Sequence, residues 1–320
     1  MSKKANRITD ESVLEMSIND FSKLCDWAPQ IPVFKLLGGE PLLHSKITEF
    51  YEVAKEMNKK LTIISNISAD AHIFDRSVPY YMASDTNITG FLINTDYPTS
   101  QEKIFKRNLR ILCETKLGMS FSTTLLPGRC EIEKARDRIQ ELAEIYREVR
   151  GSIDGFRIRL APFCPNPTDM SDFRLYDFTD DIMYFVNSLH ETGILHYGFD
   201  CPVNLCELRS DFVDACRNTS IRVRTQHCNP ETGMPFDILV DNSVIWCSSA
   251  NFIRLSDWRD YPDYTSARYE LAEQYYAWWR KNGMPEKCKS CDQLNPGLCT
   301  GFCIAKANSL RRIPIVSVKA

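Results

Sequence analysis

Four cysteines near the carboxyl end of the chain have the spacing of a metal site. They are Cys288, Cys291, Cys299 and Cys303, and they give the pattern Cys-x2-Cys-x7-Cys-x3-Cys within 16 residues. Glycines lie between them, and a glycine lets a loop fold back so that thiolates can converge. The histidine closest upstream is His227. Clustered cysteines without a neighbouring histidine favour zinc or an iron–sulfur cluster.

The whole-chain cysteine count supports this interpretation. The 320 residues include 13 cysteines, and nine of them follow residue 200. The first residues, MSKKANRITDES, contain cations but no apolar segment, so no signal peptide is predicted. We therefore expect a cytoplasmic protein, and in the reducing cytosol dense cysteine indicates metal binding or catalysis more than disulfides.

A second candidate site is the stretch KLLGGEPLLH, residues 35–44. An apolar strand is expected just before Gly38 and Gly39, where the missing Cβ atoms allow a sharp bend or the close approach of a ligand. Glu40 and Pro41 follow, and Pro41 is suited to opening the next element. A carboxylate beside bare backbone carbonyls would suit the ammonium group of a ligand. The alternative is an ordinary strand-to-helix turn with a solvated glutamate.

Strands and helices alternate along the first 190 residues. Five strand–helix units recur at intervals of about 30 residues, the size of a βα repeat. The expected strands are 33–37, 61–65, 88–94, 119–126 and 156–161. This alternation predicts a parallel sheet, either doubly wound or closed toward a barrel. No G-x-G-x-x-G follows any strand, which counts against a dinucleotide site.

Ligand sites in such folds form at the carboxyl ends of the strands. The residues expected there are Gly38, Gly39, Glu40, Asn66, Asn94, Asp96, Thr123, Thr124, Arg159 and Pro162. More than half of them have a simpler explanation, because Asn and Asp after a strand usually form turns.

The composition changes after about residue 196, where the cysteines gather. A hairpin is expected over residues 236–246, since Asp241-Asn242 in its middle tolerates a positive φ. A long helix with several aromatic residues follows over 267–280 and ends near Asn282-Gly283. We therefore predict two domains, residues 1–196 and residues 197–320.

Both motifs resemble those of one family. Gly38-Gly39-Glu40-Pro41 is similar to the GGEP motif of radical S-adenosylmethionine (SAM) enzymes, which ends the second strand of a partial TIM barrel and holds the amino group of SAM. The cysteine-rich end resembles the SPASM and twitch domains of that family. Cys228-x13-Asn242-x4-Cys247 matches their first part, with Asn242 in the glycine position. Residues 288–303 match the second part, with seven residues where five are usual and without the final cysteine of the family pattern.

The resemblance implies a partial (β/α)6 barrel without its first unit, followed by a small cysteine-rich α+β domain. It implies a SAM site formed by Gly38, Gly39, Glu40, Pro41, Asn66, Asn94, Thr123 and Arg159. It also implies one or two auxiliary 4Fe–4S clusters. Their expected ligands are Cys201, Cys206, Cys228, Cys247, Cys288, Cys291, Cys299 and Cys303.

The largest departure from the family lies before the GGEP turn. The three-cysteine motif Cys-x3-Cys-x2-Cys that holds the catalytic cluster is absent, and only Cys25 precedes the GGEP turn. Our first hypothesis is therefore a sequence truncated at its amino end. The full protein would cleave SAM reductively and abstract hydrogen from a peptide or a small molecule, with a flavodoxin or ferredoxin as electron donor. The chain as written would be inactive.

Two alternatives remain open. The chain could be a non-catalytic relative that binds a peptide or partner, or a βα protein with a structural zinc-binding tail. A net charge of −3 gives no electrostatic footprint for nucleic acid, and no apolar run reaches the ~18 residues that span a bilayer. We therefore expect neither a nucleic-acid partner nor a membrane.

Overall fold

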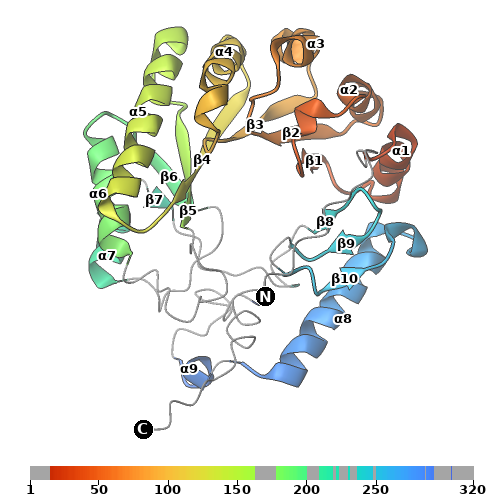
Figure 1. The fold of residues 1–320 in the computed structure, drawn as a ribbon. Coiled ribbons are helices and arrows are strands. Elements are labelled where there is room, and N and C mark those ends of the chain that lie inside the picture. The colour runs from red at the N-terminus through yellow and green to blue at the C-terminus, as the bar shows by residue number, and fades with distance from the viewer. Residues whose placement is uncertain are drawn as a thin grey trace.

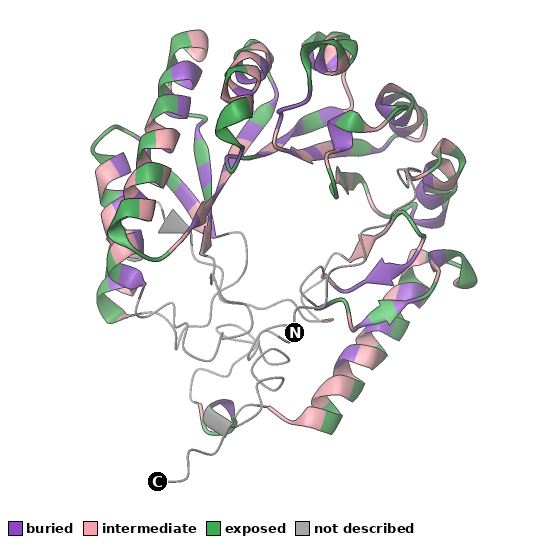
Figure 2. Ribbon diagram, viewed as in Figure 1, coloured by how far each residue is buried: buried purple, intermediate pink, exposed green. Residues whose placement is uncertain are grey.

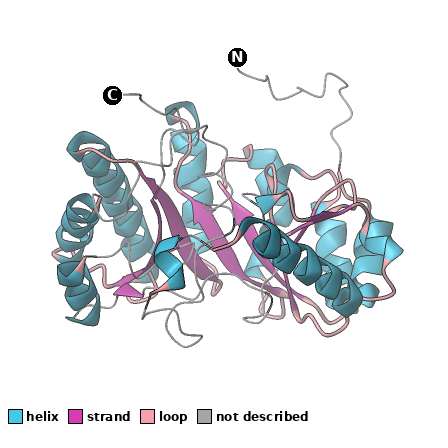
Figure 3. Ribbon diagram, turned by 90° about the horizontal axis from the view of Figure 1, so that it is seen from below, coloured by secondary structure: helices cyan, strands magenta, loops and turns pink. Residues whose placement is uncertain are grey.

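The computed structural model describes residues 15–162, 178–199, 209–218, 221–222, 230, 236–247, 250–284, 286–291 and 304. Its centre is one parallel sheet in which every strand pairs with its neighbour in sequence (Figures 1 and 3). The strands are β1 (Val33–Leu36), β2 (Lys60–Ser65), β3 (Ile88–Asn94), β4 (Gly118–Leu125), β5 (Arg157–Pro162), β6 (His196–Phe199) and β7 (Ile221–Arg222). Their order confirms the predicted parallel α/β architecture.

Helices cover the convex face of this sheet (Figure 1). They are α1 (Ile18–Trp27), α2 (Ile47–Glu56), α3 (Ala71–Met82), α4 (Glu102–Cys113), α5 (Arg129–Arg150), α6 (Thr179–His190) and α7 (Ser210–Asn218), with the 3-10 turns η1 (Pro41–Leu43) and η2 (Thr99–Gln101). Helix α1 precedes β1, whereas α2 to α7 each follow a strand of the sheet and so pack side by side. No helix among the described residues is long and apolar enough to cross a membrane.

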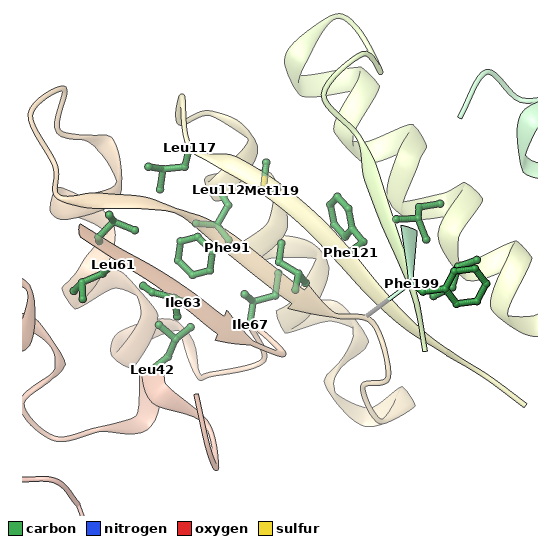
Figure 4. Close-up of a cluster of buried hydrophobic side chains, with 14 of the residues drawn as sticks. Leu42, Leu61, Ile63, Ile67, Phe91, Leu112, Leu117, Met119, Phe121 and Phe199 are labelled. Carbon is green, nitrogen blue, oxygen red and sulfur yellow. The ribbon is translucent and has the colours of Figure 1, made fainter. Parts of the chain in front are cut away.

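The hydrophobic core lies between the sheet and these helices. Alternate strand residues point into it, as the period of two requires, and they are fully buried. Leu61, Ile63, Phe91, Met119, Phe121 and Phe199 belong to this layer (Figure 4). The intervening strand residues are half-buried or exposed, so buried and more exposed residues alternate along the strands (Figure 2). We call the second face of the sheet, opposite these helices, the concave face.

The sheet extends beyond the region that the sequence analysis assigned to it. Strand β6 pairs with β5 and β7 pairs with β6, both in parallel. The predicted boundary between residues 196 and 197 therefore falls inside β6. A sixth unit, β6 with α7, joins the five that were expected. Its strand has only four residues, too few to show a clear period of two.

The carboxyl-terminal part contains a small antiparallel sheet and a long helix. Strands β8 (Asp237–Ile238), β9 (Val244–Ile245) and β10 (Arg254–Leu255) form the order β10-β9-β8. The turn η5 (Trp258–Asp260), the helix α8 (Tyr264–Asn282) and the short α9 (Glu286–Lys289) follow. The pairing of β8 with β9 confirms the predicted hairpin.

Helix α1 lies beside this small sheet (Figure 1). The indole nitrogen Nε1 of Trp27 donates to the carbonyl oxygen of Tyr261 at 2.9 Å. The Trp27 ring contacts those of Phe236, Trp258 and Tyr264 at centroid distances of 6.4, 5.4 and 5.9 Å. The amino-terminal helix is thereby joined to the carboxyl-terminal part by one aromatic cluster.

Candidate functional site

The GGEP turn follows β1 and leaves its backbone uncovered. Gly38 has φ of 94° and Gly39 has φ of 49°, so both need the left-handed region that glycine enters at no steric cost. Both residues are exposed, and the place that a Cβ atom would take at either is open. A ligand can therefore approach this backbone closely.

Glu40 is not the solvated side chain of the simpler interpretation. Its Oε1 accepts from the Ser65 hydroxyl at 2.6 Å and from the Leu42 N–H at 3.1 Å. Its Oε2 accepts from the Asn66 N–H at 3.0 Å. Glu40 thus fastens the turn after β1 to the end of β2. A carboxylate has about four lone-pair sites, so one acceptor position remains for a ligand cation.

The loop after β2 is held in a strained shape. Ile67 has φ of 45°, a rare conformation for a β-branched residue, and such strain gathers at functional sites. The Ser65 hydroxyl accepts from the Ile67 N–H at 2.8 Å. The buried amide of Asn108 donates to the carbonyls of Ile67 and Ala69 at 2.8 and 2.9 Å. The sequence analysis missed Ser65 and Asn108, because their partners lie on other elements.

Asn66 and Asn94 make turns, as the simpler interpretation expects. Asn66 Oδ1 accepts from the Ser68 N–H at 3.0 Å, and Asn94 Oδ1 accepts from the Asp96 N–H at 3.0 Å. Pro41 begins η1 and is buried. Only the Asn66 backbone N–H is joined to Glu40, so its side chain stabilises the loop.

The remaining predicted contacts lie on opposite faces of the sheet. Thr123 is 2% exposed and pairs in register with the buried Leu160, so it belongs to the helix-covered core. Asn94 and Arg159 both pair in register with Ser122, one on each side, and Arg159 is exposed. The structure therefore brings Asn94, Ser122 and Arg159 together on the concave face and leaves Thr123 behind it.

Three of the eight predicted metal ligands are described. Cys288 is buried in α9 against Trp278 and Trp279, while Cys247 and Cys291 are half-buried. The other five, Cys201, Cys206, Cys228, Cys299 and Cys303, lie outside the described residues. Within the described part of the chain, no three metal-ligating side chains gather at one place.

Two other cysteines are poor ligands for a metal. Burial raises the pKa of Cys25 to about 11, and burial likewise raises the pKa of Cys113 to about 11. Metal ligation needs the thiolate, and a thiol with such a pKa stays protonated near neutral pH. Both residues serve the hydrophobic core.

Comparison with known proteins reveals a likeness of fold. The crystal structure of Streptococcus suis SuiB matches with a TM-score of 0.57 at 14% identity, over 90% of this chain and 67% of SuiB. SuiB bound to its precursor peptide SuiA gives 0.48 at 13% identity, over 72% of this chain and 52% of that chain. SuiB bound to S-adenosylmethionine gives 0.47 at 12% identity, over 72% and 53%.

No protein-family model matches the chain, and no curated protein sequence matches it. The chain spans between half and about two thirds of the length of the SuiB structures. At this identity the likeness concerns the fold alone. It supports the predicted parallel α/β fold.

Proposed function

We propose that the chain is a radical SAM-type protein whose GGEP turn binds the ammonium group of SAM. The observation that carries the proposal is the pair of uncovered glycines at positive φ beside a carboxylate with one acceptor position left. The fold likeness to SuiB supports it, and SuiB itself has been solved with SAM.

The residues of the site divide into two groups by role. Glu40 and the carbonyls of Gly38 and Gly39 would accept hydrogen bonds from the ammonium group, which has donors and no acceptor. Ser65 and the Asn66 N–H would keep the Glu40 carboxylate in place. When bound beside a reduced 4Fe–4S cluster, SAM supplies a radical that abstracts hydrogen.

The substrate and the electron donor belong to the proposal as well. SuiB has been solved with a precursor peptide, and we extend this to a peptide or small-molecule substrate for the present fold. Asn94 and Arg159 on the concave face would contact SAM or the substrate. A flavodoxin or ferredoxin would supply electrons in the cytoplasm.

A SAM-binding measurement tests this site. Gly39→Ala places a Cβ at a residue with positive φ, in the space through which SAM would approach the backbone. It should weaken SAM binding at least about tenfold, a change of ~1.4 kcal/mol. Isothermal titration with SAM measures the dissociation constant. Gly151→Ala is the matched control, because Gly151 also has positive φ and open space but ends α5 far from the turn. Equal SAM affinity in both variants would count against the proposed site.

The eight predicted cysteines would hold one or two auxiliary 4Fe–4S clusters. Cys291 is half-buried and lies three residues after Cys288, and its backbone nitrogen is 3.4 Å from the Cys288 carbonyl oxygen. This spacing would let both thiolates bind one metal site. Iron and acid-labile sulfide after anaerobic reconstitution should fall by about half or more in Cys291→Ser. The exposed Cys130 on α5 gives the control, Cys130→Ser. Stoichiometric zinc without sulfide would instead support a structural zinc tail.

Binding without catalysis is a second candidate function. These 320 residues contain no Cys-x3-Cys-x2-Cys motif, so by themselves they lack the predicted ligands of a catalytic cluster. Such a chain would bind SAM or a peptide and form no 5′-deoxyadenosine under reducing, anaerobic conditions. Formation of 5′-deoxyadenosine by these 320 residues would reject this second function in favour of the enzyme.

A further inference from the structure

The strands of the parallel sheet carry cations but no acids. Strands β1–β6 contain no Asp and no Glu, although the chain has 42 acidic residues in total. Their cations are Lys35, Lys60, Arg157 and Arg159, all exposed and all at positions that alternate with the buried core. These strands therefore add only positive charge to the concave face, while the whole chain has a net charge of −3.

These four cations differ from those of the outer helices. On the helix layer, several cations pair with acids: Arg107 lies 2.6 Å from Asp75, and Arg110 lies 2.8 Å from Glu148. Within the described part of the chain, no ion pair includes any of the four cations of the concave face. Like charges on a surface without counter-charges repel each other, so binding of an anion would relieve the repulsion on this face.

Two of the four cations lie together on β5. Arg157 and Arg159 are two residues apart on one strand, so both point to the concave face. Arg159 has Ser122 opposite it on β4 and Gly198 opposite it on β6. Arg157 has the exposed His196 opposite it. A glycine beside Arg159 adds no side chain, and the other neighbours can donate hydrogen bonds.

We propose that Arg157 and Arg159, with Ser122 and His196, bind an oxyanion group of the substrate, a carboxylate or a phosphate. Guanidinium groups match both anions in a planar, bidentate manner. The proposal assigns an acidic substrate to the concave face. It rests on the proposed function only in calling the bound molecule a substrate, because anion binding itself requires no SAM.

Titration of the 320-residue protein with citrate and with pyrophosphate, at low salt and without SAM, tests the inference. The two probes separate a carboxylate preference from a phosphate preference. Arg157→Gln should weaken binding of the preferred probe about tenfold, and the double variant with Arg159→Gln should weaken it further. Added salt should also weaken binding, since exposed charges are screened.

Arg76→Gln is the matched control. Arg76 is exposed on α3, in the helix layer, and its replacement removes the same charge elsewhere. The double Arg157→Lys, Arg159→Lys variant keeps the charge without the planar fork, and it should bind between wild type and the glutamine variants. It also serves if the glutamine variants fail to fold, as thermal unfolding would reveal.

The outcomes separate this inference from the proposed function. Binding of neither probe by the wild type, or equal losses in Arg157→Gln and Arg76→Gln, would overturn the anion site. SAM titration of the same samples reports on the GGEP turn. Loss of probe binding in Arg157→Gln with unchanged SAM affinity supports an anion site distinct from the SAM site. Probe binding without any SAM binding would keep the anion site and reject the proposed function.

Discussion

At the scale of single residues, a buried lysine fixes the connection into the first strand. Lys59 is 6% exposed, and its ammonium group donates to the carbonyls of Ala28, Pro29 and Ile31 at 2.9, 3.0 and 2.9 Å. All three of its donors are used. Lys59 thus holds the segment between α1 and β1, the strand that ends at the GGEP turn.

Lys59→Met should therefore be strongly destabilising. It leaves the carbonyls of Pro29 and Ile31 without this partner, while the Ala28 carbonyl still accepts from the Ile31 N–H at 3.1 Å. Each polar group left unpaired costs ~1 kcal/mol or more, so we expect about 2 kcal/mol in total. Urea unfolding followed by circular dichroism gives the free energy of unfolding. Lys60→Met is the neighbouring control, because Lys60 is exposed. Similar stability of both variants would contradict the capping role of Lys59.

Asn242 combines a positive φ with a side-chain hydrogen bond in one turn. It has φ of 65° in the hairpin between β8 and β9, and Asn is among the residues that tolerate this region. Its Oδ1 also accepts from the Trp258 indole N–H at 3.1 Å, a bond that glycine could not make. Asn242→Gly should cost ~1 kcal/mol for that bond, while Asn242→Val should cost more through backbone strain. The free energies of unfolding of both variants test this order.

The neighbouring Asp241 makes the same turn sensitive to acid. The Ser243 hydroxyl and N–H donate to its carboxylate and Arg254 lies beside it, which lowers the pKa of Asp241 below its ordinary value. A lowered folded pKa gives stability above the unfolded pKa of ~4, and that stability is lost as pH falls through the folded value. Melting temperatures of wild type and Asp241→Asn should converge below pH 4. A constant difference across that range would contradict it.

At the scale of elements, alternation along the strands carried most of the prediction. The FSTT run of β4 and the apolar run of β2 predicted their strands, and the two glycines after β1 predicted the turn there. β6 and β7 escaped notice because strands of four and two residues carry too little pattern. Ser65 and Asn108 could not be found, because their roles depend on contacts with Glu40 and with the strained loop after β2.

The placement of Thr123 marks the same limit. From the sequence alone, Thr123 and its neighbours at the end of the strand are equal candidates for the site. A shift of one residue moves a side chain to the opposite face of the sheet. The register with β5 decides between them: Thr123 faces the core and Ser122 faces Arg159. Type and order of elements were therefore predictable, while the direction of individual side chains was not.

At the scale of the whole molecule, Trp27 couples the two predicted domains. Trp27→Ala removes the ring contacts to Phe236, Trp258 and Tyr264 and should cost ~3–5 kcal/mol. Trp27→Phe keeps an aromatic ring but loses the bond to Tyr261, at ~1 kcal/mol. Limited proteolysis should cut Trp27→Ala within residues 230–290 much faster than Trp27→Phe. Equal cleavage rates in wild type and Trp27→Ala would mean that the two parts fold independently.

The distance of this contact along the chain affects folding on the ribosome. Each strand of the sheet pairs with the strand made just before it, so the sheet can grow in step with synthesis. Trp27 is different, because the carbonyl that accepts its bond lies 234 residues later. Until that segment emerges, a nascent chain would present a bare indole beside its first helix. Chaperones that recognise exposed aromatic side chains would find their binding site there during most of translation.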